Sequence, residues 1–341
     1  MATHPSLLAC LPVRLRWLVV VATIALALTV RNVLANEADL GPDDLALYEQ
    51  RAYGVDLPDW YGRTPFFLYW SLGDGQAFVT MATDLGLNGP VQGFADPVYR
   101  YSRVGYSWLG RLFALGQAQF VPVGLFAVNV AALGGLAFWL GRKREELGWR
   151  VVLGLASPAL YVAFASDTSE LVGVALTSFA LFADRGGTWA AAALGAVRPE
   201  LATVLMASKR PWLRAAAAGG VAGGVRLAGG LAMDWQGSVI GSGSLGWPIA
   251  GYLEAWRHST VLSVLGSAAF LVATLLTLYV GATRRKGAER LAWLATGGLL
   301  LLLAPQVVQR PGNYLRAAAP LVLLWTIPPR PGISRPVDKA D

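Results

Sequence analysis

Residues that could carry out chemistry gather between Trp70 and Tyr106 of a chain that is otherwise strongly apolar. The stretch holds two carboxylates, Asp74 and Asp96, and an Arg/Tyr cluster formed by Tyr99, Arg100, Tyr101, Arg103 and Tyr106. A carboxylate can accept a proton from a hydroxyl group, and arginine binds phosphate oxygens through parallel hydrogen bonds. The stretch therefore predicts an active site, and the charge distribution along the chain places that site on the face away from the cytoplasm.

Asp74 is the first candidate because it precedes an amphipathic segment. Apolar residues recur there with helical spacing, at Phe78, Met81, Ala82 and Leu85. This spacing predicts a helix that lies along the outer membrane surface. Backbone N–H groups and the positive end of the dipole at a helix start stabilise a carboxylate as the anion, which suits a general base. The alternative is that Asp74 only caps the helix.

Arg100 and Arg103 lie just ahead of a long apolar run, among tyrosines that include Tyr99. Arginines beside a bilayer can hold a phosphate group. The alternative is an interfacial Arg/Tyr belt that anchors lipid headgroups, since aromatic residues commonly occupy that level. A lipid-linked phosphate would need much the same surroundings.

Further charged residues stand within or beside apolar runs. Arg226 lies inside one, where a charge costs roughly 2.5–3.5 kcal/mol unless it faces a cavity or partner or snorkels to the interface. Arg198 and Glu200 flank Pro199 and are secondary site candidates, although they could simply pair with other buried groups. Asp167 and Glu170 mark an outward turn, and Asp167 joins Asp96 and Tyr99 as a further secondary candidate. Arg310 and Arg316 bracket the last outward turn.

Composition identifies the class of protein. The 341 residues are 55% hydrophobic and only 14% charged, whereas soluble domains average about 25% charged residues. Several apolar runs reach the roughly 20 residues that cross a bilayer. The net charge of +7 comes from short basic loops between these runs, which indicates membrane topology and no nucleic-acid partner. The lone Cys10 excludes an internal disulfide, and His4 and His258 lack ligand spacing, so no metal cofactor is expected.

We therefore predict an all-α, polytopic bundle of about eight full crossings that forms a single domain over residues 1–341. The apolar runs predict helices at about 15–34, 119–140, 150–165, 171–183, 212–232, 259–281, 289–308 and 314–325. The first helix is expected to stay uncleaved. Residues 36–118 form a long first extracytoplasmic loop with amphipathic surface helices, and residues 234–258 form a second.

The runs 189–197 and 201–207 are each too short to span a bilayer. Pro199 disfavours helix in the residue before it and lacks a backbone donor. These runs predict a hairpin of two half-length helices that enters and leaves on the cytoplasmic side. Irregular backbone at membrane depth needs cover from protein or water, so the hairpin tip implies an internal cavity.

Several short motifs resemble one known family. They are Asp74-Gly75-Gln76-Ala77-Phe78, Tyr99-Arg100-Tyr101-Ser102-Arg103-Val104-Gly105-Tyr106, Ala165-Ser166-Asp167-Thr168-Ser169-Glu170-Leu171, Val197-Arg198-Pro199-Glu200 and Tyr314-Leu315-Arg316. In this order they are similar to segments of the polyprenyl-phosphate-dependent glycosyltransferases of the C-type superfamily. The mannosyltransferase-like branch, which includes the glycosylphosphatidylinositol mannosyltransferases, is the most similar.

The resemblance implies a multi-pass enzyme of the cell membrane. A mannose-like sugar on a polyprenyl phosphate would be the donor, and a glycan or glycolipid the acceptor. Asp74 would deprotonate the acceptor hydroxyl, which attacks the anomeric carbon with inversion, and arginines among Arg100, Arg103, Arg226, Arg310 and Arg316 would neutralise the departing phosphate. Two other functions stay open: a carrier or flippase for lipid-linked saccharides, and a non-catalytic membrane subunit of envelope glycan assembly.

Overall fold

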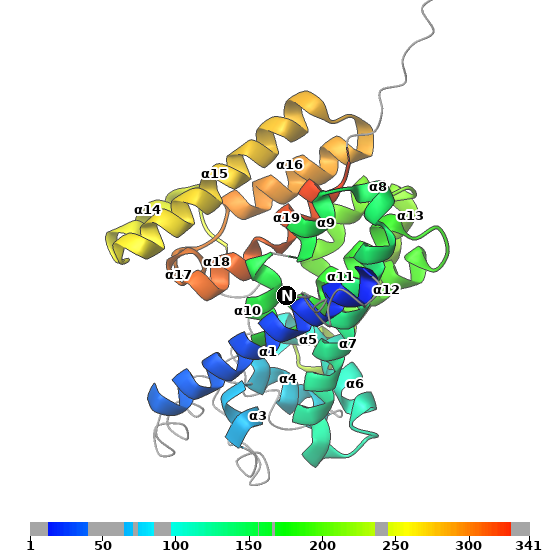
Figure 1. Ribbon diagram of the computed structural model, residues 1–341, viewed down its shortest axis with the longest axis vertical. Helices are drawn as coiled ribbons and strands as arrows, with labels where there is room; N and C mark the ends of the chain where they lie inside the picture. The colour runs from blue at the N-terminus through cyan, green and yellow to red at the C-terminus, as the bar shows by residue number, and fades with distance from the viewer. Residues whose placement is uncertain are drawn as a thin grey trace, which may run out of the picture.

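The computed structural model describes residues 13–39, 65–70, 74–84, 97–155, 157–165, 168–235 and 245–328. These residues form helices joined by short turns, and no strand occurs among them. The predicted all-α class is therefore confirmed for this part of the chain (Figure 1).

The bounds of the helices are as follows. In the first half they are α1 (Val13–Asp39), α3 (Pro65–Trp70), α4 (Asp74–Thr83), α5 (Pro97–Tyr101), α6 (Val104–Phe113), the 3₁₀ helix η4 (Ala118–Phe120), α7 (Val121–Arg142), α8 (Arg144–Leu147), α9 (Arg150–Leu155) and α10 (Pro158–Ala165). In the second half they are α11 (Glu170–Phe182), α12 (Gly187–Val197), the 3₁₀ helix η5 (Pro199–Ala207), α13 (Pro211–Ala232), α14 (Ala250–Arg257), α15 (Val261–Arg284), α16 (Gly287–Leu301), α17 (Pro305–Gln309), α18 (Pro311–Ala317) and α19 (Ala319–Thr326).

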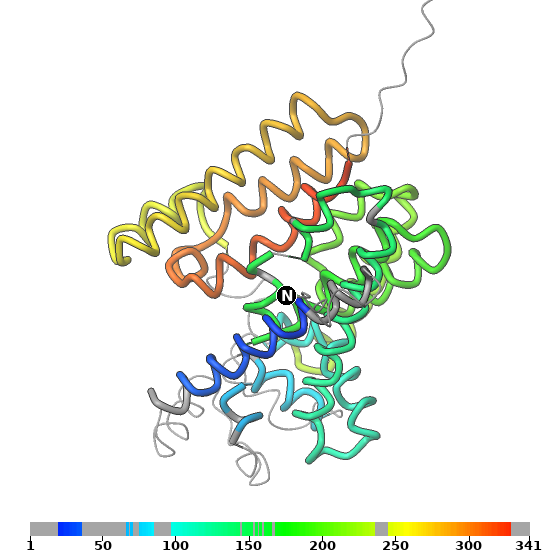
Figure 2. The backbone as a smooth tube through the Cα atoms, viewed as in Figure 1, coloured from blue at the N-terminus to red at the C-terminus, as the bar shows by residue number. Residues whose placement is uncertain are grey.

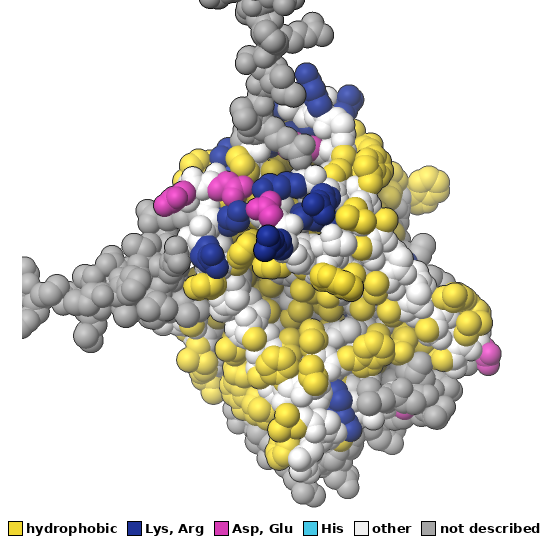
Figure 3. Space-filling model, turned by 90° about the vertical axis from the view of Figure 1, so that its right-hand side faces the viewer, with side chains coloured by type: hydrophobic (Ala, Val, Ile, Leu, Met, Phe, Trp, Pro, Cys, Tyr) yellow, Lys and Arg dark blue, Asp and Glu magenta, His cyan; other side chains and the backbone are white. Residues whose placement is uncertain are grey.

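Three helical segments of the described chain are long and apolar enough to cross a membrane: Ala118–Arg142, Pro211–Ala232 and Val261–Arg284. Their outward faces are apolar, and α15 alone exposes Val261, Leu262, Leu265, Val272, Leu275 and Leu276. A soluble protein rarely exposes so continuous an apolar surface. Figure 3 shows another side of the molecule, on which α8, α12 and α13 lie in Figure 1, and hydrophobic side chains cover much of it below a gathering of Lys and Arg side chains. The segments are as expected for a membrane protein, whereas the count of eight crossings stays a prediction.

Buried side chains form three hydrophobic cores. The first joins α1, α7, α9–α13, η5, α16 and α19, the second joins α3–α7, and the third joins α14–α19. α1 contributes to the first two through one stripe, which buries Val21, Ala25, Thr29 and Val33. The helices α14, α15 and α16 lie together on one side of the molecule, with α17, α18 and α19 next to them (Figure 1). Of these, α16 also packs directly against η5.

Three of the helices predicted to span the membrane are each divided into two shorter helices, so their predicted continuity is wrong. The run 150–165 is divided into α9 and α10 before Pro158, and the run 289–308 is divided into α16 and α17 before Pro305. The run 314–325 is divided at Ala318, two residues before Pro320. Proline lacks the backbone donor that a continuing helix needs and clashes with the preceding turn. Hydrophobicity located these runs correctly, but the prolines set where their helices end.

The end of α16 is completed by the second predicted loop, 234–258. The amides of Gly246 and Ile249 donate to the carbonyl oxygens of Leu302 and Leu301 at 2.6 and 2.9 Å. The Tyr252 hydroxyl on α14 donates to the Leu300 carbonyl at 3.0 Å. The last carbonyls of a helix lack partners within it, and here the loop supplies them. The described end of this predicted loop therefore packs against the bundle and forms a helix.

The predicted hairpin of two short helices is present as α12 and η5. Both ends lie on the same side, because Lys209 after η5 pairs with Asp184 before α12 at 2.7 Å. Lys143, next to the end of α7, also lies close enough to act electrostatically on Asp184. We call this side of the molecule the basic end. The 9 residues of η5 form a 3₁₀ helix, which rises about 2.0 Å per residue and is therefore about 18 Å long. The 11 residues of α12 form an α-helix of similar length, roughly 16 Å.

The predicted loop 36–118 does not remain outside the bundle. Within it, α6 runs back along the first half of α7, as the backbone tube shows (Figure 2). Gly110 and Gly124 meet at this contact, where a Cβ on Gly124 would lie 2.2 Å from the Gly110 carbonyl oxygen. Farther along, the Asn129 side chain donates to the Tyr106 hydroxyl at 2.6 Å. Since α7 is one of the spanning segments, α6 lies beside it at membrane depth.

The surface position expected for the helix near Asp74 is also wrong. The helix is present as α4, but it packs against α6 and α7. Its residues from Gly75 to Ala82 are all buried, polar ones included. The amphipathic pattern near Asp74 therefore belongs to a helix that is buried in the protein, together with its polar side chains Gln76 and Thr80.

We expect Gly124→Ala to lower the melting temperature of the detergent-solubilised protein, because the new methyl group must push α6 away from α7. Gly219→Ala is the matched control, since a Cβ at Gly219 on α13 meets nothing within 4 Å. Alanine favours helix over glycine by about 1 kcal/mol, so this control should melt at the same temperature or higher. Equal melting of both variants would contradict the close contact between α6 and α7.

The spanning segments also predict which positions share a membrane face. In a Cys10→Ser background, cysteines introduced at Gln117 and His258 should react with an impermeant maleimide from one side of the membrane. Cysteines at Arg210 and Lys286 should react only from the other side, because the helices α7, α13 and α15 lie between these positions. Labelling of all four positions from one side would rule out this arrangement.

Candidate functional site

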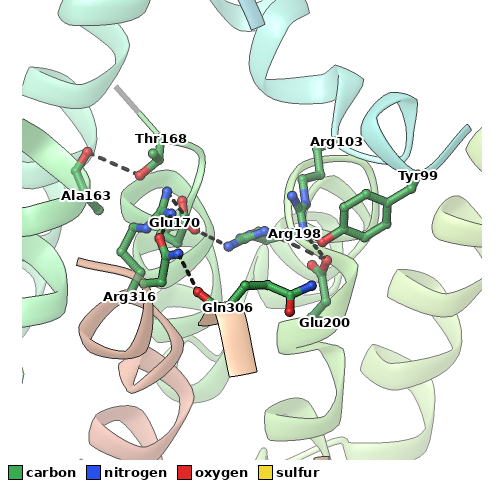
Figure 4. A network of polar contacts seen from close by, with 10 residues as sticks. Tyr99, Arg103, Ala163, Thr168, Glu170, Arg198, Glu200, Gln306 and Arg316 are labelled. Atoms are coloured by element: carbon green, nitrogen blue, oxygen red, sulfur yellow. Dashed lines mark hydrogen bonds and ion pairs between the residues drawn. The ribbon is translucent and has the colours of Figure 1, made fainter. Parts of the chain in front are cut away.

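Four separate parts of the chain bring polar and charged side chains together at the junction of the three cores. Tyr99 and Arg103 come from the α5–α6 corner, Glu170, Arg198 and Glu200 from the starts of α11 and η5, and Arg316 from α18. We call these six residues the arginine–glutamate network (Figure 4).

Arg103 joins the α5–α6 corner to the hairpin tip. Its Nη2 donates to Glu200 Oε1 at 2.6 Å and also donates to the Tyr99 hydroxyl. The guanidinium lies over the Tyr99 ring, 4.4 Å from its centroid, so the ring stabilises the charge by a cation–π interaction. The corner itself places both side chains, because Tyr99 lies in α5 and Arg103 directly precedes α6.

Arg198 occupies the break between α12 and η5. Its backbone is extended, with φ −153° and ψ 71°, as expected for the residue before Pro199. The side chain crosses α11 over Gly173, where a Cβ would lie 2.7 Å from the Arg198 Cβ. From there Nη2 forms an ion pair with Glu170, while Nη1 lies 3.8 Å from Glu200 Oε1.

Glu170 and Arg316 close the other side of the network. Arg316 Nη1 lies 3.8 Å from Glu170 Oε1, and Arg316 Nη2 donates to Asn313 Oδ1 at 2.6 Å. The Asn313 amide donates in turn to the Gln306 carbonyl oxygen at 3.3 Å. This chain of contacts fixes α17 and α18 against the start of α11.

The network combines three arginines with two glutamates, which leaves an excess of one positive charge. Exposure is uneven, since the Glu170 side chain is 9% exposed and the Glu200 side chain 40%. Arg103 and Arg198 both lie next to the Glu200 carboxylate and stabilise its anion, so Glu200 is poorly suited to donate or accept a proton.

The network lies part-way through the bundle. A helix rises about 1.5 Å per residue, so α12 carries Arg198 roughly 16 Å from the basic end. The Tyr106–Asn129 contact, one turn from Arg103, lies 13 residues, or about 20 Å, from Arg142 at the end of α7. Both values place the network well away from the basic end, and the Tyr106–Asn129 contact lies more than halfway along α7 from Arg142.

Not all predicted arginines join the network. Of the five candidate donor-binding arginines, Arg103 and Arg316 belong to it, and Arg100 is half-buried on α5 beside it. Arg310 is exposed at the start of α18. Arg226 is half-buried on α13 with its Nε enclosed by protein, and the described contacts do not connect it to the network. The secondary candidates Tyr99, Arg198 and Glu200 are all members.

The predicted base lies on a helix that packs against α6. Asp74 is the first residue of α4, and its side chain lies outside the described part of the structure. The Phe78 ring, one turn later, contacts the Tyr106 ring edge-on at a centroid distance of 4.9 Å. Tyr106 is in turn three residues from Arg103. Asp96 and Asp167 lie outside the described residues.

Sequence reasoning treated Glu170 as part of an outward turn, although it is the innermost carboxylate of the network. One signal was available: Gly173 follows Glu170 by one helical turn and opens space on α11 for a long side chain. Asn313, which orients Arg316, carried no comparable signal. Within the described residues, no group of three or more His, Cys, Asp or Glu side chains could hold a metal ion.

No protein-family model matches the chain, and neither the curated proteins nor the solved structures include a match. The arguments about function therefore rest on the site and on the membrane-type bundle that carries it.

Glu170→Gln should destabilise the protein, because it leaves Arg198 and Arg316 without their shared buried carboxylate. Loss of one partner of a buried pair costs about 3–5 kcal/mol, so we expect a clear drop in melting temperature. Asp184→Asn removes a carboxylate from an exposed pair with Lys209 and is the control, with little change expected. Similar melting of both variants would show that the network does not stabilise the junction of the cores.

Proposed function

We propose that this protein is an inverting glycosyltransferase that takes a mannose-like sugar from a polyprenyl-phosphate donor. The observation that carries the proposal is the convergence of Arg103, Arg198 and Arg316 around the starts of α11 and η5, within an apolar bundle. Paired charges at membrane depth usually mark a substrate site. An anionic group attached to a lipid is the ligand that can reach such a site from within the bilayer.

The roles follow from the chemistry of the residues. Arg103, Arg198 and Arg316, with Arg100 nearby, neutralise the phosphate as negative charge develops on it. Asp74, at the start of α4, removes the proton from the acceptor hydroxyl. That oxygen attacks the anomeric carbon, the bond from that carbon to the phosphate oxygen breaks, and polyprenyl phosphate leaves. A lipid phosphate is a good leaving group, so no acid partner is needed and Glu200 can stay ionised.

Location and partners follow from the same argument. The site faces the extracytoplasmic side of a multi-pass cell-membrane protein, where both the lipid donor and a glycan or glycolipid acceptor are present. No divalent metal is required, because the arginines supply the positive charge that a metal would otherwise provide.

A carrier for lipid-linked saccharides is the second candidate, since the α12–η5 hairpin interrupts the helical bundle as the discontinuous helices of transporters do. A non-catalytic subunit of glycan assembly is the third. Both would keep the lipid-phosphate site but would not need Asp74 as a base.

We expect Asp74→Asn to reduce sugar transfer at least 100-fold while leaving the melting temperature and lipid-phosphate binding unchanged, since general-base catalysis contributes about 10²–10⁴-fold. The assay is transfer from a panel of radiolabelled polyprenyl-phosphate sugars to a membrane extract by the purified protein in proteoliposomes.

Asp234→Asn is the control, because it makes the same chemical change at an exposed turn and Asn also accepts its positive φ of 46°. Equal transfer by Asp74→Asn and wild type would remove Asp74 from the mechanism. Absence of transfer by the wild-type protein with every donor, alongside retained binding of the lipid phosphate, would favour the carrier or the subunit.

A further inference from the structure

The Glu200 carboxylate occupies a position between two arginines. Glu200 Oε1 lies 2.6 Å from Arg103 Nη2 and 3.8 Å from Arg198 Nη1. The first contact is a short charge-assisted hydrogen bond, and the second exceeds hydrogen-bond length. One carboxylate therefore reaches both guanidinium groups but bonds well to only one of them (Figure 4).

The two glutamates of the network are not equivalent. Glu170 is almost fully buried and its carboxylate faces Arg198 and Arg316 from inside the bundle. Glu200 is the most exposed charged member of the network, with 40% of its side chain exposed. A buried carboxylate is enclosed by its partners, whereas a more exposed one has fewer contacts that hold it in place.

Arg103 offers little room for a second anion while Glu200 stays in place. Its Nη2 already donates to both Glu200 and the Tyr99 hydroxyl, and its Nε is enclosed by protein without a hydrogen-bond partner. An incoming phosphate can bond to Arg103 Nη2 only by taking the place of the carboxylate. A phosphate group carries more acceptor oxygens than the single one that Glu200 presents, so it can satisfy Arg103 and Arg198 together.

We propose that the gap between Arg103 and Arg198 is the binding site for the phosphate of a lipid, and that Glu200 is an internal competitor which the phosphate displaces. This inference rests on the proposed function for the identity of the ligand as a lipid phosphate. It adds a specific subsite and gives Glu200 a role that is neither catalytic nor structural. When no phosphate is bound, the Glu200 carboxylate neutralises the two arginines. Neutral or weakly anionic lipids do not displace it.

Binding of dodecyl phosphate to the purified protein in nanodiscs tests the competition directly, with dodecanol as the uncharged analogue. Glu200→Gln removes the competing charge and should tighten binding of dodecyl phosphate about tenfold, since a hydrogen bond to a charged group is worth about 1.5–3 kcal/mol. Dodecanol binding should not change. Glu254→Gln, which removes a carboxylate from an exposed position on α14, should leave both affinities unchanged.

Unchanged or weaker binding of dodecyl phosphate by Glu200→Gln would overturn the proposal, since it would mean that Glu200 holds the arginines in place for the ligand. Inorganic phosphate binding as tightly as dodecyl phosphate would overturn the assignment to a lipid. The binding assay does not depend on sugar transfer. Tighter binding without transfer would leave the subsite intact and reject the enzyme, and transfer without tighter binding would reject only the competition.

The wild-type protein gives a second measurement that needs no variant. A water-soluble carbodiimide with an amine labels protonated carboxyl groups, so Glu200 should react poorly while it is paired with Arg103. Dodecyl phosphate should increase labelling of Glu200, quantified by mass spectrometry of its peptide, because the displaced carboxyl group is no longer paired with Arg103 and becomes accessible to the reagent. A decrease in labelling on addition of dodecyl phosphate would show that the ligand covers Glu200 and does not displace it.

Discussion

Neutralisation of charge inside an apolar bundle is the constraint on which the rest of this structure depends. Arg103, Arg198 and Arg316 cannot be left alone at membrane depth, because an unpaired charge there is costly. Only two glutamates are present to pair with the three arginines. Each arginine can have a carboxylate partner only if all five side chains meet at one place. That requirement holds the α5–α6 corner, the hairpin tip and α18 together, at the place where the three hydrophobic cores meet.

The interruptions of the helices follow from the same requirement. A side chain at the middle of a long straight helix can reach only its immediate neighbours, whereas a residue at a helix end can be directed into the bundle. Arg198 precedes Pro199, Arg103 precedes α6, and Glu170 opens α11, so each lies where a helix begins or ends. The prolines that make the bundle irregular are thus also what allows charges from distant segments to meet.

The sequence predicted the helical class and most of the apolar helices because these depend on local composition. The helices α7, α11, α13 and α15 lie close to their expected positions, and the short pair α12 and η5 has the expected break at Arg198. The predicted helices were too long wherever a proline lay within an apolar run, as at Pro158 and Pro305. Hydropathy alone does not detect a missing backbone hydrogen-bond donor.

The pairings of the candidate site could not be predicted in the same way. Arg103 and Glu200 are 97 residues apart, and Arg198 and Glu170 are 28 residues apart. The sequence marked Arg103, Arg198, Glu200 and Arg316 as candidates because they are charges among apolar residues, but it gave no information on which partner each would find. The position of α4 was missed for a related reason, because a helical pattern of apolar residues does not distinguish a membrane surface from a protein interior with polar side chains.

The 3₁₀ form of η5 sets the spacing between the network and the basic end. A 3₁₀ helix of 9 residues is longer than most, and the same residues wound as an α-helix would be about 4 Å shorter. With the 3₁₀ rise, Glu200 reaches Arg103 near one end of η5 while Lys209 reaches Asp184 beyond the other. The type of helix, and not only its length in residues, therefore allows both contacts to form at once.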